Sequence, residues 1–280
     1  MNYLRGSAFA ALFVFVAMAP SVFGQKTGVK EVLEGHLASL GSAEARATVK
    51  NRIGVGEASV RFVTGKTPTA NGRVVMANEG EKVFLGMTFN TNDYPQEAFS
   101  FNGKNVNVAA VRVGTRSVLG NFLVSNGALI KESLLGGALF SSWGPAHSDT
   151  SKAKIKFDGT KKLDGGEAYV LSYSTKGGGD ITVKLYFDKE TFRHVRSEYS
   201  RISSAGIGRT PDESARFNET RLKMTEEFSD FRQVDGLTLP FRHLMNYSTT
   251  GQNGTTEIEW TFNYTEFAFN QQLAPDTFGE

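Results

Sequence analysis

Cysteine is absent from this chain of 280 residues, and its absence excludes several functional classes. Without thiols there can be no disulfide, no thiol nucleophile, no thiolate metal site and no lipid-attached cysteine. An excess of charge is also missing, since 31 lysines and arginines stand against 29 aspartates and glutamates. Binding to nucleic acid relies on a basic surface that neutralises phosphates. The composition therefore predicts no nucleic-acid partner.

The motifs of common catalytic and cofactor sites are missing as well. No Gly-x-Ser-x-Gly pentapeptide occurs, and His147, His194 and His243 are too scattered to form a two-histidine metal motif. The KGGGD segment that begins at Lys176 lies between two predicted strands, so it lacks the helix N-terminus that a bound phosphate needs. The sequence therefore predicts no catalytic residue, no metal site, no cofactor and no enzymatic activity.

The sequence contains two carboxylate pairs that are candidates for acid/base sites. Glu226 and Glu227 are adjacent on a predicted strand and should face opposite ways, while Glu257 and Glu259 should both face solvent. A hydrolase remains an alternative if two histidines, or a histidine and a carboxylate, converge in a pocket. His194 and His243 side by side in a cleft would favour that alternative.

The first 24 residues have the pattern of a secretory signal peptide. Arg5 supplies a positive charge, the apolar run from Ala8 to Ala19 is too short to span a bilayer, and Pro20 ends it. Val22-Phe23-Gly24 then fits a cleavage site before Gln25, whereas an uncleaved membrane anchor is the alternative. We expect a periplasmic protein with one domain over residues 25–280.

The mature chain is predicted to begin with helices and to continue almost entirely as strands. Apolar residues at three- and four-residue spacing indicate a helix from Val29 to Leu40, with Gly41 as a left-handed C-cap, and Ser42 can cap a second helix through Val49. His36 should pack on the apolar face of the first helix. Period-two patterns separated by Gly, Asn and Asp turns predict twelve antiparallel strands: 53–63, 73–77, 82–89, 98–101, 105–111, 153–163, 168–174, 181–187, 192–202, 220–231, 237–247 and 256–267.

One apolar segment with helical spacing interrupts the strands between Ser117 and Trp143. Gly136 and Gly137 weaken its second half, because each glycine costs a helix about 1 kcal/mol relative to alanine. We expect a helical insertion, only weakly stable by itself, that lies on one apolar and aromatic face of the sheet.

Several segments resemble a known family. They are EVLEGHLASLGSAEA from Glu31, the strand from Arg52, GGEAYVLSY from Gly165, LYFDKETFRHVRSEY from Leu185 and VDGLTLPFRH from Val234. Together they are similar to divergent outer-membrane lipoprotein-sorting proteins of the LolA/LolB-like fold. The resemblance implies a mainly β protein whose single antiparallel, strongly curved sheet forms an incomplete β-barrel, with an N-terminal helix and a helical lid. The missing cysteine matches the soluble periplasmic carrier of that family rather than its anchored acceptor.

The resemblance also implies a function in outer-membrane biogenesis. The protein would carry or sense acyl chains of lipoproteins, phospholipid or other amphipathic ligands, exchanging them with transfer components of the inner and outer membranes. A latching arginine of the lid could be Arg46, Arg52 or Arg61. The predicted ligand cavity is formed by Trp260, Phe262, Tyr264, Ile258, Phe241, Leu185 and Phe187, and the predicted lid by Leu129, Ile130, Leu134, Leu135 and Leu139.

Two alternatives concern these predicted cavity and lid residues. Aromatic alternation alone does not separate a cavity from a filled core, so the same side chains could simply pack together. A domain of the same fold could also bind or signal through envelope proteins without transferring lipid. An open hydrophobic patch without a deep cavity would indicate that second alternative.

Overall fold

The computed structural model describes residues 28–64, 69–146, 154–176, 179–205, 219–252 and 254–279. The predicted signal peptide and His147 lie outside the described residues. The helices are α1 (Val29–Leu40), α2 (Ala43–Thr48), α3 (Val118–Ser125), α4 (Ala128–Lys131) and the 3₁₀ helix η1 (Gly137–Leu139). The first six strands are β1 (Asn51–Phe62), β2 (Ala70–Glu79), β3 (Lys82–Phe89), β4 (Gln96–Phe101), β5 (Val106–Val108) and β6 (Lys154–Leu163). The other six are β7 (Gly166–Ser174), β8 (Thr182–Asp188), β9 (His194–Ser203), β10 (Thr220–Val234), β11 (Leu237–Gly251) and β12 (Gly254–Phe269).

All twelve strands belong to one antiparallel sheet. Their order is β5-β4-β3-β2-β1-β12-β11-β10-β9-β8-β7-β6, so β5 and β6 form two separate edges and the sheet does not close into a barrel. Strand β1 pairs with β12 from Arg52↔Phe269 to Phe62↔Ile258, and this pairing joins the two halves of the chain. The predicted fold class is therefore confirmed.

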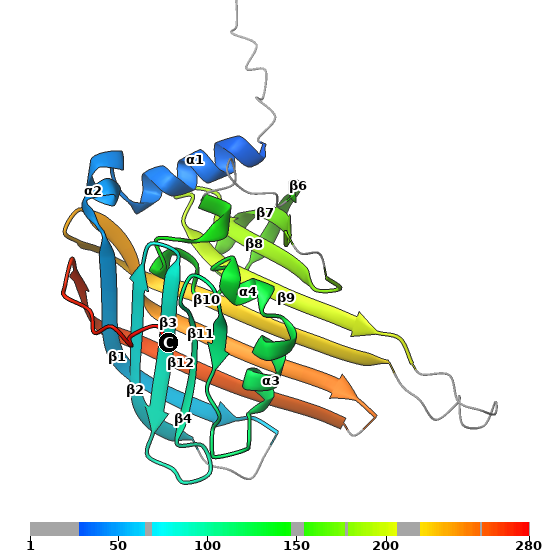
Figure 1. The fold of residues 1–280 in the computed structure, drawn as a ribbon. Coiled ribbons are helices and arrows are strands. Elements are labelled where there is room, and N and C mark those ends of the chain that lie inside the picture. The colour runs from blue at the N-terminus through cyan, green and yellow to red at the C-terminus, as the bar shows by residue number, and fades with distance from the viewer. Residues whose placement is uncertain are drawn as a thin grey trace, which may run out of the picture.

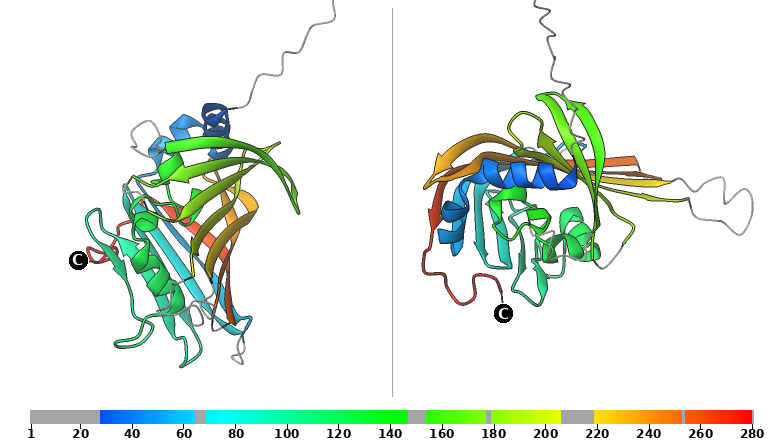
Figure 2. Two further views of the ribbon diagram at one scale, coloured as in Figure 1. Left: turned by 90° about the vertical axis from the view of Figure 1, so that its right-hand side faces the viewer. Right: turned by 90° about the horizontal axis from the view of Figure 1, so that it is seen from above.

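The sheet curves around the insertion that contains α3, α4 and η1 (Figures 1 and 2). Helix α3 packs against β4 and β5, whereas η1 packs against β9 and β11, so the insertion contacts both walls of the concave face. Helices α1 and α2 close one end of the same concavity (Figure 1). One large apolar cluster fills the space between the sheet and these helices.

Alternation along the strands produces this core, as the sequence predicts. Along β12, Trp260 and Phe262 are fully buried while Asn263 between Phe262 and Tyr264 is exposed. On the opposite face, residues such as Arg61 and Glu259 form ion pairs in contact with solvent. The concave face is thus apolar and aromatic, and the convex face is polar.

Two local predictions need correction. Strand β5 is only three residues long instead of spanning 105–111, because the chain bends after Val108 into a turn in which Arg112 and Thr115 exchange backbone hydrogen bonds. Gly41 has a φ of 135° and a ψ of 174°, outside the left-handed helical region that was expected. It is needed for close approach, since a Cβ there would lie 2.4 Å from the carbonyl oxygen of Gly236.

Among the residues that the structure describes, none of the helices combines the length and the apolar character needed to cross a bilayer.

Candidate functional site

A mainly apolar pocket of about 320 Å³ lies where α1 and α2 meet the insertion. We call it the apolar pocket. Its walls include Leu37 and Leu40 of α1, Phe140 and Trp143 after η1, and Leu237 and Leu239 of β11. Its volume falls at the lower end of the range of about 300 to 1,000 Å³ that is typical of small-molecule sites.

Arg52 lies in the wall of this pocket and holds the insertion to the sheet. Its Nη1 donates hydrogen bonds to the carbonyl oxygens of Ala138 (2.8 Å) and Leu139 (2.7 Å), both in η1. The side chain comes from the first residues of β1, directly after α2, so the register of β1 fixes its position. These two bonds join the helical insertion to the strand at the centre of the sheet.

The charge of Arg52 has little compensation. The residue is 5% exposed, and within the described residues no carboxylate lies within ion-pair distance of it. Burial lowers the pKa of its guanidinium to about 10, so the group is still a cation at neutral pH. Its guanidinium carbon lies 5.7 Å from the centre of the Phe269 ring, and its buried Nε has no hydrogen-bond partner among the described residues. Carbonyl dipoles and one ring therefore provide most of its stabilisation.

The other two candidate arginines are placed differently. Arg46 also lines the apolar pocket, and its Nε donates to the carbonyl oxygen of Gly41 over 3.3 Å. Arg61 lies on the convex face, where it pairs with Glu259. Of the three arginines that the sequence left open, Arg52 is the one that forms hydrogen bonds to the insertion within the described residues.

A row of buried aromatic and histidine rings lies beside the apolar pocket. His36 of α1 makes an edge contact with Trp143 (5.1 Å between centroids), and Trp143 lies 4.6 Å from His194 of β9. The Nδ1 of His36 is 3.2 Å from the carbonyl oxygen of Phe192, which ties α1 to the β8–β9 turn. Burial lowers the pKa of His36 to about 4, so its ring is neutral at pH 7. The predicted packing position of His36 is confirmed, because the side chain is 0% exposed.

The two histidines that could have indicated a hydrolase are separated by a phenylalanine. The Phe228 ring lies between them, 5.0 Å from His194 and 4.8 Å from His243. Burial holds the pKa of His194 well below its usual range. Both histidines belong to the buried core, and the pockets described here are lined by other residues.

One histidine and one carboxylate do meet inside the core. His243 Nε2 lies 2.9 Å from Glu226 Oε1, and Glu226 also accepts hydrogen bonds from the backbone N–H of Gly136 and the hydroxyl of Tyr199. Since Glu226 is fully buried and its neighbour Glu227 is exposed, the two carboxylates face opposite ways as predicted. The buried pair fixes the insertion at Gly136 and has no opening to a substrate-sized pocket among those described.

The predicted cavity and lid residues are all brought together by the fold. The seven cavity side chains are at most 7% exposed, the five lid side chains are at most 1% exposed, and all twelve belong to one cluster. The apolar pocket is lined by other residues, which lie where α1, the end of the insertion and β11 converge. Entry of an acyl chain among the twelve stays a prediction.

The residues of the apolar pocket could be identified only in part from the sequence. The helical spacing of α1 marks Leu37 and Leu40 as apolar-face residues, and alternation in β11 marks Leu237 and Leu239. Trp143 stands at the end of the insertion, where no periodic pattern indicates which way it points. The pocket itself arises from tertiary contacts that local patterns do not encode.

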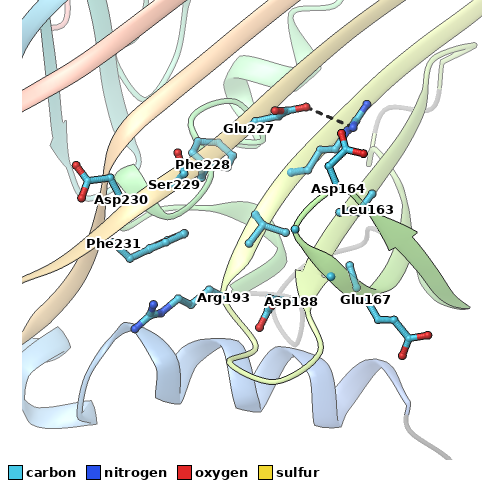
Figure 3. Close-up of a pocket in the computed structure, with 15 residues that line it drawn as sticks. Leu163, Asp164, Glu167, Asp188, Arg193, Glu227, Phe228, Ser229, Asp230 and Phe231 are labelled. Carbon is cyan, nitrogen blue, oxygen red and sulfur yellow. Dashed lines mark ion pairs between the residues drawn. The ribbon is translucent and has the colours of Figure 1, made fainter.

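A second, polar pocket of about 500 Å³ lies between the β6–β7 turn, the start of β9 and the middle of β10 (Figure 3). Several of its charged groups already have partners in the structure. Glu227 pairs with Arg196, and Arg193 lies over the ring of Phe231 at 5.2 Å. Asp188 accepts hydrogen bonds from the backbone and hydroxyl of Thr191. In the part of the chain that the structure describes, no cluster of histidine and carboxylate side chains has the arrangement needed to hold a metal ion.

Comparison with known proteins gives matches among solved structures alone. No protein-family model matches the sequence, and no curated protein matches it. The structure is similar to a LolA superfamily protein from Nitrosomonas europaea, with 14% identity, a TM-score of 0.48, and 91% of this chain and 98% of that chain covered. A DUF1329 family protein from Desulfovibrio piger is similar at 12% identity and a TM-score of 0.46, with 89% and 96% covered.

A chain of the Pseudomonas aeruginosa MucA/MucB complex matches at 9% identity and a TM-score of 0.23, with 86% of this chain and 100% of that chain covered.

Proposed function

We propose that this protein is a non-enzymatic periplasmic carrier or sensor that binds the acyl chain of an amphipathic ligand in the apolar pocket. The observation that carries the proposal is the pocket itself, with apolar walls and with Arg52 holding η1 beside it. Burying an acyl chain there would contribute about 0.8 kcal/mol for each methylene removed from water.

The charges around the pocket indicate where the polar end of the ligand would lie. Arg46 and Arg52 both line the pocket, whereas none of the aspartates and glutamates that the structure describes does. The buried Nε of Arg52 is without a hydrogen-bond partner in the described residues, and an anionic or ester head group could accept from it. We therefore infer that the ligand places its polar head near these arginines and its acyl chain against Leu37, Leu40 and Leu239.

Release and uptake would depend on the insertion. Two neutral carbonyl groups bind Arg52, and a charge bound only by carbonyl dipoles is held less firmly than one paired with a carboxylate. A small rearrangement of η1 would widen the pocket without separating any strands. Export through the predicted signal peptide would deliver the protein to the periplasm, and mass spectrometry of the native protein should find Gln25 at its N-terminus.

A nitroxide-labelled stearic acid tests the proposal, because it quenches only nearby tryptophans. The chain has two tryptophans, so Trp260→Phe leaves Trp143 in the wall of the pocket, and Trp143→Phe leaves Trp260 inside the core. We expect saturable quenching in Trp260→Phe and little in Trp143→Phe. Quenching of Trp260 alone would place the ligand in the cavity predicted from the sequence and would refute the apolar pocket.

A pair of neighbouring substitutions on α1 provides the control. Leu37 lines the pocket and Ala38 is exposed, so Leu37→Glu and Ala38→Glu introduce the same charge one residue apart. We expect Leu37→Glu to weaken binding at least tenfold and Ala38→Glu to change it less than twofold. The fatty acid or a bound phospholipid should be recovered chemically unchanged, whereas a hydrolysed ester would support the hydrolase alternative instead.

A further inference from the structure

A third concave surface lies at the free edge of the sheet, beside β5. It is a groove of about 660 Å³ between β5, the end of α3, α4 and the β7–β8 connection. Its apolar surface comes from Val106 and Val108 of β5 and from Val124 of α3, which is 50% exposed. We call it the lysine-rimmed groove, because Lys104, Lys131 and Lys176 stand around it.

The positive charge of this groove is not neutralised by neighbouring side chains. Within the described residues none of the three lysines forms an ion pair, and each is exposed. Glu132 is the one carboxylate in the lining, and both of its oxygens are engaged. They accept hydrogen bonds from the Tyr173 hydroxyl and from the backbone N–H of Lys176, each over 2.8 Å. These donors are neutral, so the described lining carries three lysine charges against one carboxylate and is positive overall.

The backbone of β5 adds unpaired hydrogen-bonding groups. Ala109 donates its backbone N–H to Ala98 in β4, and Phe99 pairs with Val108 in the next position of the register. Because donors alternate sides along an antiparallel strand, Val106 and Val108 direct their N–H and C=O groups away from β4. No partner for these outward groups exists among the described residues, since β5 is the last strand of the sheet.

The other edge of the sheet differs in how its lysines are arranged. Strand β6 carries Lys154, Lys156, Lys161 and Lys162 on the strand itself, and its register shifts between Phe157 and Gly159. Lysines and a bulge on an edge strand are common means of preventing strand addition. Around β5 the three lysines come from the β4–β5 turn, from α4 and from the β7–β8 connection, and they surround an apolar surface.

We propose that the lysine-rimmed groove binds an extended, acidic segment of a partner protein, which adds to the sheet as a strand beside β5. The partner backbone would pair with Val106 and Val108, its alternate apolar side chains would contact Val124, and its carboxylates would pair with the three lysines. This interaction is independent of the apolar pocket, so a carrier could engage its partner while it holds a ligand.

The test uses a fluorescein-labelled peptide of alternating glutamate and valine, seven residues long, with the full mature chain. We expect saturable binding by fluorescence anisotropy that weakens as salt rises. Hydrogen exchange should slow at Val106 and Val108 when the peptide binds. A peptide of alternating lysine and valine should bind at least tenfold more weakly.

Two sets of variants separate strand addition from simple charge attraction. Reversing charge at Lys104, Lys131 and Lys176 to glutamate should weaken binding at least tenfold, while the same change at Lys154, Lys156 and Lys162 of β6 should alter it less than twofold. Val108→Pro removes an outward N–H and keeps the pairing of β5 with β4, so it should weaken binding at least fivefold. Equal binding by wild type and Val108→Pro would overturn the proposal.

Vesicles containing phosphatidylglycerol distinguish an acidic protein segment from an anionic lipid surface. Vesicle binding that depends on the three lysines but not on Val108→Pro, together with no peptide binding, would assign the groove to lipid and refute strand addition. Stearic acid in the apolar pocket should not displace the peptide, because the two sites are separate. A protein that fails to bind the peptide could therefore still bind stearic acid, and the acyl-chain proposal would stand.

Discussion

Arg52 combines two roles that usually occur at different residues. It is a buried cation whose compensation comes from the carbonyl groups of η1, and it is also part of the wall of the apolar pocket. Three arginines were open candidates for a latch because local sequence does not show how far a strand residue is from a distant helix. The register of β1 with β2 and β12 places Arg52 where it hydrogen-bonds to η1, and its role as a latch stays a prediction.

Replacing Arg52 with methionine should loosen η1 without unfolding the protein. The substitution removes two hydrogen bonds and also removes a costly buried charge, and these effects oppose one another. We expect a change in the free energy of unfolding below about 2 kcal/mol. Hydrogen exchange at the amides of Leu139 and Phe140 should rise at least tenfold, and Arg61→Met on the convex face should leave it unchanged.

The protonation of His36 should make the fold sensitive to acid. Burial lowers the pKa of His36 from its ordinary value of 6.5 to about 4, so below pH 6.5 the unfolded chain binds the proton more tightly than the folded protein does. The free energy of unfolding is therefore unaffected by protonation of His36 above pH 6.5. It falls as the pH drops from 6.5 toward 4, by about 3 kcal/mol in total. Burial of His194 acts in the same direction.

Urea denaturation at pH 7.5 and 4.5 measures this effect. His36→Phe keeps an aromatic ring beside Trp143 and removes the titrating group, so it should lose about 2.5 kcal/mol of the acid sensitivity that wild type shows. If both proteins lost the same stability between these pH values, His36 would not be the group responsible.

At the scale of elements, the insertion is held to the sheet by polar groups that its own sequence does not indicate. Helical spacing correctly predicted α3 and α4, but α4 already ends at Lys131, before Gly136 and Gly137, and η1 begins at Gly137. The polar anchors were not predictable, because Tyr199 and Glu226 come from distant strands. The Tyr199 hydroxyl donates to the carbonyl oxygen of Leu134, and the N–H of Gly136 donates to Glu226. The insertion is therefore fixed at several points along its length.

Gly137→Ala should push η1 away from the sheet at His194. Gly137 has a φ of 50°, and a Cβ there would lie 2.6 Å from Nδ1 of His194. The control is Gly80→Ala, because Gly80 has a similar φ of 55° with open space around it. Both changes should strain the backbone by about 1 to 2 kcal/mol, and Gly137→Ala should cost at least a further 1 kcal/mol because two atoms clash. Equal unfolding free energies for the two variants would show that η1 is free to shift.

The positions of the strands were easier to predict than the pockets that form between distant segments. Turn residues and alternation located all twelve, since each signal lies within a few neighbouring residues. The shortness of β5 depended on a turn after it and on its place at the sheet edge. The apolar pocket and the lysine-rimmed groove each combine segments that are separated along the chain, so neither was visible as a motif.

At the scale of the whole molecule, ligand binding should raise thermal stability. A ligand present at one hundred times its dissociation constant stabilises the folded state by about 2.7 kcal/mol, if it does not bind the unfolded chain. For a protein of this size that corresponds to a rise in Tm of about 5 to 10 °C. Differential scanning fluorimetry with stearic acid should show this rise in wild type and a much smaller one in Leu37→Glu.

The pairing of β1 with β12 has a consequence for folding during synthesis of the protein. Strand β12 is the last strand in the chain and lies in the middle of the sheet, between β1 and β11. A growing chain on the ribosome therefore holds two incomplete meanders, and their pairing through β1 and β12 is complete only when Phe269 has been made. The whole sheet can form only after nearly all of the polypeptide has been synthesised, so the protein must complete its fold at the end of translation or after it.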